Sequence, residues 1–371
     1  MKKKVLHFIH GLNMGGAETL VTKYASLLDK KKYEVIVLCY QHYPDSPYEE
    51  FLKQKGIPLL YACDAMPFYG KNGYISKLIN HYQMYLEIRK AIHKINPDII
   101  HTHLPHNHFL HFATPKRGTK IFYTQHSSIS RWLKLNRADV KHLQWIIQRY
   151  PTRLIALTPK MKRELDVLFS VNNTVIIRNG IETERYRQTI NRHAKRLQLG
   201  IPLDAFLIVH VGRFSPVKNH HFLVDIFQEI SKRVKKAWLL MVGSGEEEAS
   251  IRKKLHKNGQ DEHYLILSNR TDVAEILQCA DVGVFPSISE GLGIAFVEMQ
   301  AAGLPIVVSD AVPRTAQISE RVKYLSLSEK PEVWTDELLK LYKCSGEINE
   351  ELLRAWDISE SVKELEKIYE M

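Results

Sequence analysis

The chain has 371 residues, which is too long for one compact core and indicates two domains. Its hydrophobic content of 44% and charged content of 25% are typical of a folded protein and exclude general disorder. The net charge is +11, and the excess lies in residues 1–182, which hold 27 Lys and Arg against 13 Asp and Glu. This asymmetry indicates an anionic partner for the first half: nucleic acid, a membrane surface or a phosphorylated substrate.

Four scattered cysteines without paired spacing exclude a disulfide framework and a zinc knuckle and are typical of a reducing compartment. The first residues resemble a signal peptide, but their short apolar run is broken by His7 and His10, so we interpret it as a strand. No apolar run approaches the ~20 residues that a membrane-spanning helix requires. We therefore expect a cytoplasmic protein, or a peripheral one on the inner face of the plasma membrane.

Short, continuous apolar runs alternate with helical patterns along the first half, as is typical of strands that are buried on both faces. The predicted strands span 5–10, 34–40, 98–103, 120–126, 153–158 and 174–179. Helical patterns between them include 17–28 and 74–95.

After about residue 183 comes a polar, Arg-rich connector without an apolar period, and the alternation then restarts. The predicted strands of this second half span 206–212, 237–243, 264–268, 281–287 and 305–310. The pattern predicts an α/β fold with two doubly wound, Rossmann-like domains. Because such sheets bind ligands outside the carboxyl ends of their strands, we expect a site in a cleft between two facing domains.

A glycine turn, GLNMGGAET, follows the first predicted strand and opens a helix. Gly15 and Gly16 would let the backbone approach a ligand, and a helix amino terminus favours an anion. The turn is neither a GxGxxG nor a GxxxxGK[ST] motif, so a plain tight turn is the alternative interpretation.

A second loop, VGRFSPVKNH, follows the first strand of the second half and carries Arg213 and Lys218. Two cations at the carboxyl end of a strand suit a diphosphate, the arginine as a planar fork and the lysine as a point charge. Alternatively, both are solvated surface charges.

The stretch EGLGIAFVEMQAAGLP places Glu290 and Glu298 on either side of a glycine-rich helix entrance. Gly291 and Gly293 leave backbone N–H groups open at the helix amino terminus, which suits a phosphate. Ionised carboxylates only accept hydrogen bonds, so these two acids suit the hydroxyls of a sugar or ribose. The alternative is a charge complement to the helix dipole plus an exposed helix residue.

Together these residues resemble the family 4 retaining glycosyltransferases of GT-B fold. The likeness rests on R-x4-K (Arg213, Lys218), E-x7-E (Glu290, Glu298) and SNRTDV between them, and it extends over HGLNMGGAET, YTQHS, IIRNGIETERY and WDISESVKELEKIYEM. Within the family the chain is most similar to bacterial capsule and exopolysaccharide transferases.

The resemblance implies an acceptor-binding domain over 1–182, a nucleotide-sugar-binding domain over 183–353, and a last helix over 354–371 that packs back on the first domain. It implies a UDP-sugar donor, a glycan or polyprenyl-diphosphate-linked acceptor, and retention of configuration.

The resemblance also implies the roles of individual residues. Gly15 and Gly16 approach the donor diphosphate, which Arg213 and Lys218 neutralise. The donor sugar is met by catalytic His126 and Glu290 and by the amides of Gly291, Leu292 and Gly293. Glu298 holds the ribose, and the base lies along the backbone of Asn269 and Arg270.

We expect no metal cofactor, because no Asp-x-Asp motif is present to hold a divalent ion against a diphosphate. The run HTHLPHNHFLH has five histidines, but no carboxylate or thiol accompanies them in sequence. Acceptor-side contacts or plain packing are the preferred interpretations of this run, with His103 as the tentative acceptor-side residue.

Residues 131–149 form a basic amphipathic pattern with tryptophans, which indicates either contact with an anionic membrane surface or a helix packed on the first domain. Trp132, Leu135, Leu143, Trp145 and Ile146 are interleaved there with Arg131, Lys134, Arg137, Lys141 and Arg149.

Two alternative functions stay open. A nucleotide-sugar epimerase of the same architecture would need an acid and a base at the sugar, and Glu290 is one obvious candidate. A basic nucleic-acid-binding protein would explain the net charge, but helix-turn-helix, zinc and RNP-like signatures are absent from the sequence, so no nucleic-acid partner is expected.

Overall fold

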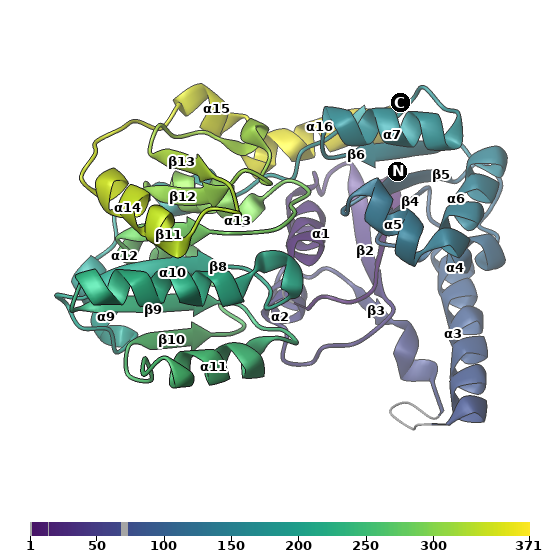
Figure 1. The fold of residues 1–371 in the computed structure, drawn as a ribbon. Helices are drawn as coiled ribbons and strands as arrows, with labels where there is room; N and C mark the ends of the chain where they lie inside the picture. Colours follow the sequence, from purple (N-terminus) through teal and green to yellow (C-terminus); the bar gives the residue numbers. More distant parts are fainter. Residues whose placement is uncertain (1, 14, 68–72) are drawn as a thin grey trace. The chain divides into compact units, whose positions relative to one another are not determined.

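A computed structural model describes residues 2–13, 15–67 and 73–371, with the side chain of Arg131 excepted (Figure 1). The chain divides into two compact units. Unit 1 comprises Met1–Asn179 together with Ser361–Met371, and unit 2 comprises Gly180–Glu360. Each unit is built on one parallel sheet, which confirms the predicted α/β class with two Rossmann-like domains.

The sheet of unit 1 has seven strands in the order β3-β2-β1-β4-β5-β6-β7. Its strands are β1 (Lys3–Ile9), β2 (Tyr33–Cys39), β3 (Leu59–Tyr61), β4 (Ile99–His103), β5 (Lys120–Thr124), β6 (Thr152–Ala156) and β7 (Val175–Ile176). The helices are α1 (Gly16–Leu27), α2 (Pro47–Gln54), η1 (Ala62–Ala65), α3 (Tyr74–Ile95), α4 (Asn107–Ala113), α5 (Ile129–Leu135), α6 (Arg137–Arg149) and α7 (Pro159–Phe169).

The two faces of this sheet differ in chemistry because strand side chains alternate. One face is apolar: Leu6, Phe8 and Ile100 pack against α3, α4 and α6, which run along one side of the sheet in Figure 1. The other face carries His7 and His101 under Tyr24 of α1 and Tyr369 of the last helix, α16 (Ile358–Glu370). A layer of polar side chains is therefore buried on the second face.

The last helix belongs to unit 1 from Ser361 onward. Tyr369 is fully buried, and its ring lies 4.8 Å from that of Phe122 on β5. Glu366 accepts a hydrogen bond from the backbone N–H of Asp29 at 2.8 Å. These contacts complete the core of unit 1 with the last residues of the chain.

The sheet of unit 2 has six strands in the order β10-β9-β8-β11-β12-β13. Its strands are β8 (Phe206–Val211), β9 (Ala237–Val242), β10 (Tyr264–Leu267), β11 (Val282–Phe285), β12 (Ile306–Ser309) and β13 (Val322–Leu325). The helices are α8 (Thr183–Arg187), α9 (Arg192–Gln198), η2 (Pro216–Lys218), α10 (His220–Arg233), α11 (Glu248–Lys257), α12 (Val273–Cys279), α13 (Ile294–Ala301), η3 (Arg314–Ala316), α14 (Pro331–Tyr342) and α15 (Glu350–Arg354). An apolar cluster under α10, α11 and α14 forms its core on one face.

The predicted polar connector after residue 183 is instead folded into unit 2 as α8 and α9. Arg196 of α9 is 3% exposed and donates hydrogen bonds to the carbonyls of Cys279 and Ala205 and to the carboxylate of Asp281. The segment lacks an apolar period because hydrogen bonds and ion pairs, rather than an apolar face, hold it in place.

Candidate functional site

Two loops of unit 2 meet because they follow neighbouring parallel strands. Lys218 lies after β8 and Glu290 after β11, and these strands pair in the sheet. The Lys218 Nζ lies 2.6 Å from Glu290 Oε1, with only 20% and 10% of the two side chains exposed. Lys218 also lies over the ring of Phe285, 5.1 Å from its centroid. The structure therefore brings these two predicted site residues into one half-buried ion pair.

Arg213 lies on the loop between β8 and Lys218, but its side chain is 73% exposed and forms an ion pair with Glu246 at 3.2 Å. An exposed pair of this kind contributes little stability, so the guanidinium is free to turn toward an anion. The loop itself is fixed by close packing: a Cβ at Gly243 would lie 2.1 Å from the carbonyl oxygen of Gly212.

The amino terminus of α13 leaves backbone N–H groups open. Gly293 caps the helix with φ +74°, a conformation that favours glycine. Within the described part of the chain, the N–H groups of Gly291, Leu292 and Gly293 donate no hydrogen bond. Together with the helix dipole, they form an amino-terminal site that suits a phosphate oxygen.

Glu298 lies farther along α13 and is held by Tyr186 of α8, whose hydroxyl donates to Glu298 Oε1 at 2.7 Å. Burial raises the pKa of Glu298 to about 7, although the hydrogen bond from Tyr186 and the charge of Arg185 oppose the shift. Sequence reasoning missed Tyr186, which is an aromatic hydroxyl within the segment predicted as a connector.

The two predicted base-binding residues, Asn269 and Arg270, differ in their contacts. Asn269 is exposed and has φ +53°. Arg270 donates to Asp272 at 2.7 Å, and Lys195 contacts the same carboxylate. Burial alone would raise the pKa of Asp272, but these two cations lower it to about 2. The guanidinium of Arg270 is thus held within unit 2 by Asp272. Only the backbone of Arg270 then remains for the predicted contact with the nucleotide base.

In unit 1 the glycine turn begins α1, and Met14 of this turn lies outside the described residues. A Cβ at Gly15 would lie 2.3 Å from a carboxylate oxygen of Glu18, whereas a Cβ at Gly16 would meet nothing within 4 Å. The carboxylate of Glu18 therefore lies beside Gly15 in the first turn of α1. A diphosphate that approaches this turn would have to displace it.

His126 follows β5 and is half-buried. Burial lowers its pKa to about 4, so the ring is neutral at pH 7. Its Nε2 lies 3.2 Å from Nδ1 of His103. His103 is 0% exposed and contacts His126, which agrees with the packing interpretation of the histidine run, and its acceptor-side role stays a prediction.

Three histidines, His7, His101 and His103, place ring nitrogens within 4.8 Å of one another, a spacing that a metal ion requires. Five of the six ring nitrogens are already engaged, however, and Nε2 of His7 is the exception. His101 contacts the hydroxyls of Tyr369 and Thr124, both at 2.7 Å, and His103 contacts His7 and His126. The arrangement is that of a hydrogen-bonded network of imidazoles.

A carboxylate does lie near the histidine run, although the sequence did not predict one there. Asp139 of α6 accepts hydrogen bonds from the backbone and side chain of Asn107 and lies 4.0 Å from Nδ1 of His108.

The basic amphipathic pattern at 131–149 forms two helices, α5 and α6, rather than one. Trp132, Leu143 and Ile146 belong to the core of unit 1. Trp145 is stacked on His111 with ring centroids 3.8 Å apart and is covered by Arg149. These two tryptophans are therefore packed within unit 1, while Leu135, Lys134 and Lys141 are exposed.

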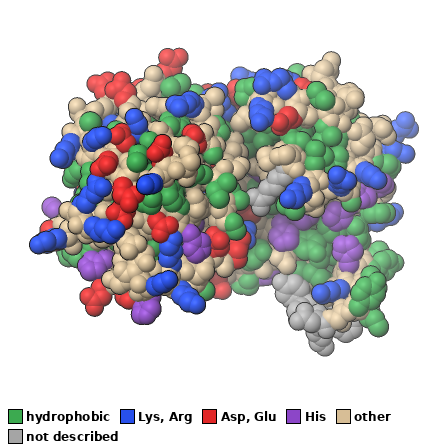
Figure 2. Space-filling view, viewed as in Figure 1, with side chains coloured by type: hydrophobic (Ala, Val, Ile, Leu, Met, Phe, Trp, Pro, Cys, Tyr) green, Lys and Arg blue, Asp and Glu red, His purple; other side chains and the backbone are tan. Residues whose placement is uncertain are grey.

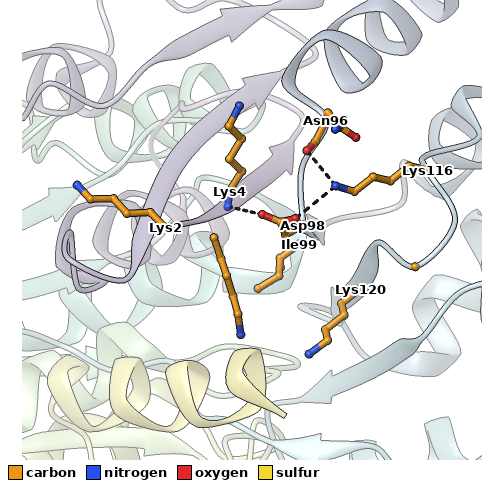
Figure 3. A pocket seen from close by; sticks show the side chains of 9 residues that line it. Lys2, Lys4, Asn96, Asp98, Ile99, Lys116 and Lys120 are labelled. Atoms are coloured by element: carbon orange, nitrogen blue, oxygen red, sulfur yellow. Dashed lines mark hydrogen bonds and ion pairs between the residues drawn. The ribbon is translucent and has the colours of Figure 1, made fainter.

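A pocket of about 530 Å³ lies at the amino ends of β1, β4 and β5, the opposite edge of the sheet from His126 (Figure 3). Its lining contains the lysines Lys2, Lys3, Lys4, Lys116 and Lys120. Asp98 partly balances this charge: it accepts from the backbone of Lys4 at 2.9 Å and pairs with Lys116 at 3.3 Å. The pocket contributes to the basic character of the first half.

Comparisons with known proteins agree with this geometry. Residues 14–185 match the model for Glycosyltransferase Family 4, and residues 191–357 match that for Glycosyl transferases group 1. EpsF of Bacillus subtilis (strain 168) is 28% identical over 354 residues, covering 91% of this chain and 88% of EpsF.

Two further comparisons cover most of the chain. An Escherichia coli UDP-Gal:α-D-GlcNAc-diphosphoundecaprenol α-1,3-galactosyltransferase is 26% identical and covers 83% of this chain and 80% of its own. The crystal structure of HepE from Anabaena with UDP and glucose superposes with a TM-score of 0.76 at 17% identity, covering 99% of both chains. Because the two family models together span nearly the whole sequence and the fold agrees, the chain belongs to the family 4 glycosyltransferases of GT-B fold.

Proposed function

We propose that unit 2 binds a nucleotide diphosphate sugar, with UDP as the nucleotide, and that the enzyme transfers the monosaccharide to a glycan in surface polysaccharide biosynthesis. One observation carries this proposal: the Lys218–Glu290 pair, on loops that follow adjacent strands, adjoins the open amides at the start of α13. A cation and amides suit a diphosphate, and the carboxylates of Glu290 and Glu298 suit sugar hydroxyls. Relatives that use UDP-galactose or bind UDP and glucose support the choice of UDP.

In this proposal His126 acts on the donor sugar from unit 1. A neutral imidazole donates or accepts a hydrogen bond without adding charge next to the diphosphate. The family relationship supports retention of configuration. NMR of the product formed from an α-linked donor tests this point: an α-linkage is expected, and a β-linkage would contradict it.

A thermal-shift panel of UDP-glucose, UDP-galactose, UDP-N-acetylglucosamine and GDP-mannose tests the donor. A tight donor raises the apparent melting temperature by mass action, and we expect a rise with at least one UDP-sugar. A Lys218→Ala variant should lose this rise, whereas Lys254→Ala, which breaks an ion pair with Asp225 elsewhere in unit 2, should keep it. Equal shifts in both variants would contradict the proposed role of Lys218.

We further propose that transfer needs no metal ion, because Lys218, Arg213 and the α13 amides supply the positive charge that a divalent ion would otherwise supply. Activity should survive treatment with EDTA. Loss of activity that Mg²⁺ or Mn²⁺ restores would overturn this part of the proposal.

The acceptor is proposed to be lipid-linked, and the surface that would contact the membrane is α3 rather than the tryptophans of α5 and α6, which are packed within unit 1. Five large side chains of α3 are exposed, and their spacing places them on one side of the helix. They are Tyr74 (80%), Ile75 (71%), Leu78 (53%), Ile79 (36%) and Tyr82 (63%). Figure 2 shows hydrophobic side chains gathered at the amino-terminal end of α3. No helix of the described residues combines the length and apolarity needed to cross a membrane.

Sedimentation with vesicles that contain anionic lipid tests the membrane contact. An Ile75→Ser/Leu78→Ser variant should lose most of its vesicle binding, because each buried aliphatic side chain contributes roughly 1.5–3 kcal/mol. Val167→Ser, an 81% exposed residue of α7, is the matched control and should bind as the unmodified protein does. Equal retention of all three proteins would argue against α3.

A further inference from the structure

Three imidazole rings form a hydrogen-bonded row that begins deep in unit 1 and ends at His126. His7 of β1 places its Nδ1 3.2 Å from Nε2 of His103, and His103 places its Nδ1 3.2 Å from Nε2 of His126. His7 and His103 are both 0% exposed, whereas His126 is half-buried. We call this row the imidazole chain.

The rings of the imidazole chain are neutral. Burial lowers the pKa of His7 to about 3 and that of His126 to about 4, and it lowers the pKa of His103 well below its usual value. A neutral imidazole has one N–H donor and one bare nitrogen acceptor. The middle ring, His103, must therefore donate to one neighbour and accept from the other, so both hydrogen bonds point in the same direction along the imidazole chain.

The His7 end of the imidazole chain decides the direction in which its hydrogen bonds are donated. Nε2 of His7 is buried and has no hydrogen-bond partner among the described residues. If the rings donated inward, this atom would carry an unpaired, buried N–H, which folded proteins rarely leave unsatisfied. If they donate outward, Nδ1 of His7 carries the proton, and only a lone pair is left without a partner. Outward donation is the arrangement that avoids a buried orphan donor.

Outward donation fixes what His126 presents to a ligand. Its Nε2 accepts from His103, so its proton lies on Nδ1, which makes no hydrogen bond within the described part of the chain. We infer that His103 and His7 are positioning residues, which hold the His126 ring in place with its Nδ1–H free to donate to an oxygen of the donor sugar. This inference rests on the proposed function for the identity of the ligand, but not for the proton positions.

The protonated nitrogen can be read directly by NMR on substrate-free protein with ¹⁵N-labelled histidine rings. The His126 signals are assigned by their loss in His126→Gln. We expect a protonated Nδ1 and a bare Nε2; a proton on Nε2 would overturn the inference. One equivalent of zinc in the purified protein that is lost when His103 is replaced would also overturn it, because a metal would then occupy the ring nitrogens.

Two variants of His103 separate positioning from packing. His103→Asn keeps a donor N–H near the position of Nδ1, whereas His103→Leu has similar size and no donor. We expect kcat of the Leu variant to fall about 10-fold or more with the donor KM changed less than about 3-fold, since a misplaced group loses turnover rather than binding. The Asn variant should regain most of the kcat. Equal losses in both variants would overturn the role of His103.

A control lies elsewhere in the same unit. His93 of α3 is exposed and contacts the carbonyl of Ala113 at 2.9 Å, so His93→Leu should leave kcat unchanged. The two proposals also fail separately. A protein that shows Nδ1–H on His126 but transfers no sugar would end the proposed function and leave the imidazole chain standing. An active enzyme with Nε2–H would do the reverse.

Discussion

The two units share a parallel α/β fold, but the carboxyl edges of their sheets carry different side chains: charged ones in unit 2 and neutral ones in unit 1. In unit 2 the loops carry charges that neutralise one another, as Lys218 and Glu290 do at 2.6 Å. In unit 1 the equivalent edge carries the neutral ring of His126, which is backed by further neutral rings. Both arrangements keep the edge close to electroneutral, but only the first can rearrange to bind a charged ligand.

This difference implies a division of labour within the family 4 architecture. An ion pair can exchange one partner for a diphosphate, so unit 2 suits the charged part of the donor. Buried imidazoles stay neutral at neutral pH, so unit 1 suits uncharged oxygens, such as those of the sugar in the proposed function. Substitutions in each unit test this difference.

Removing the neutral donor of unit 1 should have the largest effect. His126→Ala is expected to lower kcat about 10²-fold, the loss typical of one donor aimed at a reacting centre. The affinity for UDP, measured by calorimetry, should change little, because the nucleotide is proposed to bind unit 2. A large loss of UDP affinity with unchanged kcat would show that the roles of the two units have been exchanged.

Removing a charge from unit 2 should act on binding. Lys218→Ala should weaken UDP binding about 10- to 100-fold, since a hydrogen bond to a charged group contributes about 1.5–3 kcal/mol. Part of this loss should come from Glu290, which is left unpaired beside the diphosphate. The double variant Lys218→Ala/Glu290→Gln should therefore bind UDP more tightly than Lys218→Ala alone. A double variant that binds no better would show that Glu290 does not face the diphosphate.

The raised pKa of Glu298, about 7, should make the proposed binding of UDP depend on pH. Only the ionised carboxylate accepts from both ribose hydroxyls, so UDP affinity should rise as the pH increases from 6 to 8. Glu298→Gln should bind UDP more weakly by about 1–3 kcal/mol and lose the part of the pH dependence that UDP itself does not cause.

The same shift has an opposite effect on stability. Because the folded pKa lies above the usual value of 4.5, the folded state binds the proton more tightly. Stability should therefore fall as the pH rises from below 4.5 through about 7, and it should fall less in Glu298→Gln. Melting curves that coincide for the two proteins at all pH values would contradict this assignment.

The smallest effect is expected at the back of the imidazole network. Tyr369→Phe removes the hydroxyl that contacts His101 at 2.7 Å, and the free energy of unfolding should fall by about 1 kcal/mol. Tyr342→Phe, a 44% exposed tyrosine of unit 2, is the control and should be neutral. Equal stability of the two variants in thermal denaturation would mean that the hydroxyl of Tyr369 is not a structural partner.

The sequence was sufficient to predict the strands in the middle of both sheets, because strands that are buried on two faces are continuous apolar runs. It missed β3 and β13, which are edge strands with partly exposed side chains. It also misread α8 and α9 as a connector, since polar pairs such as those of Arg196 have no period.

The residues of the candidate site were likewise predicted only in part. Lys218 and Glu290 were placed together because each directly follows a predicted strand, and parallel strands align their ends. Tyr186 and His7 were missed because their partners are 112 and 96 residues away in the chain. Local patterns carry no information about such pairings, and the burial of His103 depends on helices that the sequence does not place.

The contribution of the last residues to unit 1 has a consequence for biosynthesis. Tyr369 closes the layer above His101 and Phe122, yet it is made only after all of unit 2 has been synthesised. Since amino-terminal domains ordinarily fold first during translation, the nascent first unit must wait, at about 5–20 residues per second, for nearly 200 further residues before its core is sealed. Synthesis of unit 2 therefore precedes closure of the core of unit 1, because Tyr369 can reach His101 only after both sheets have been made.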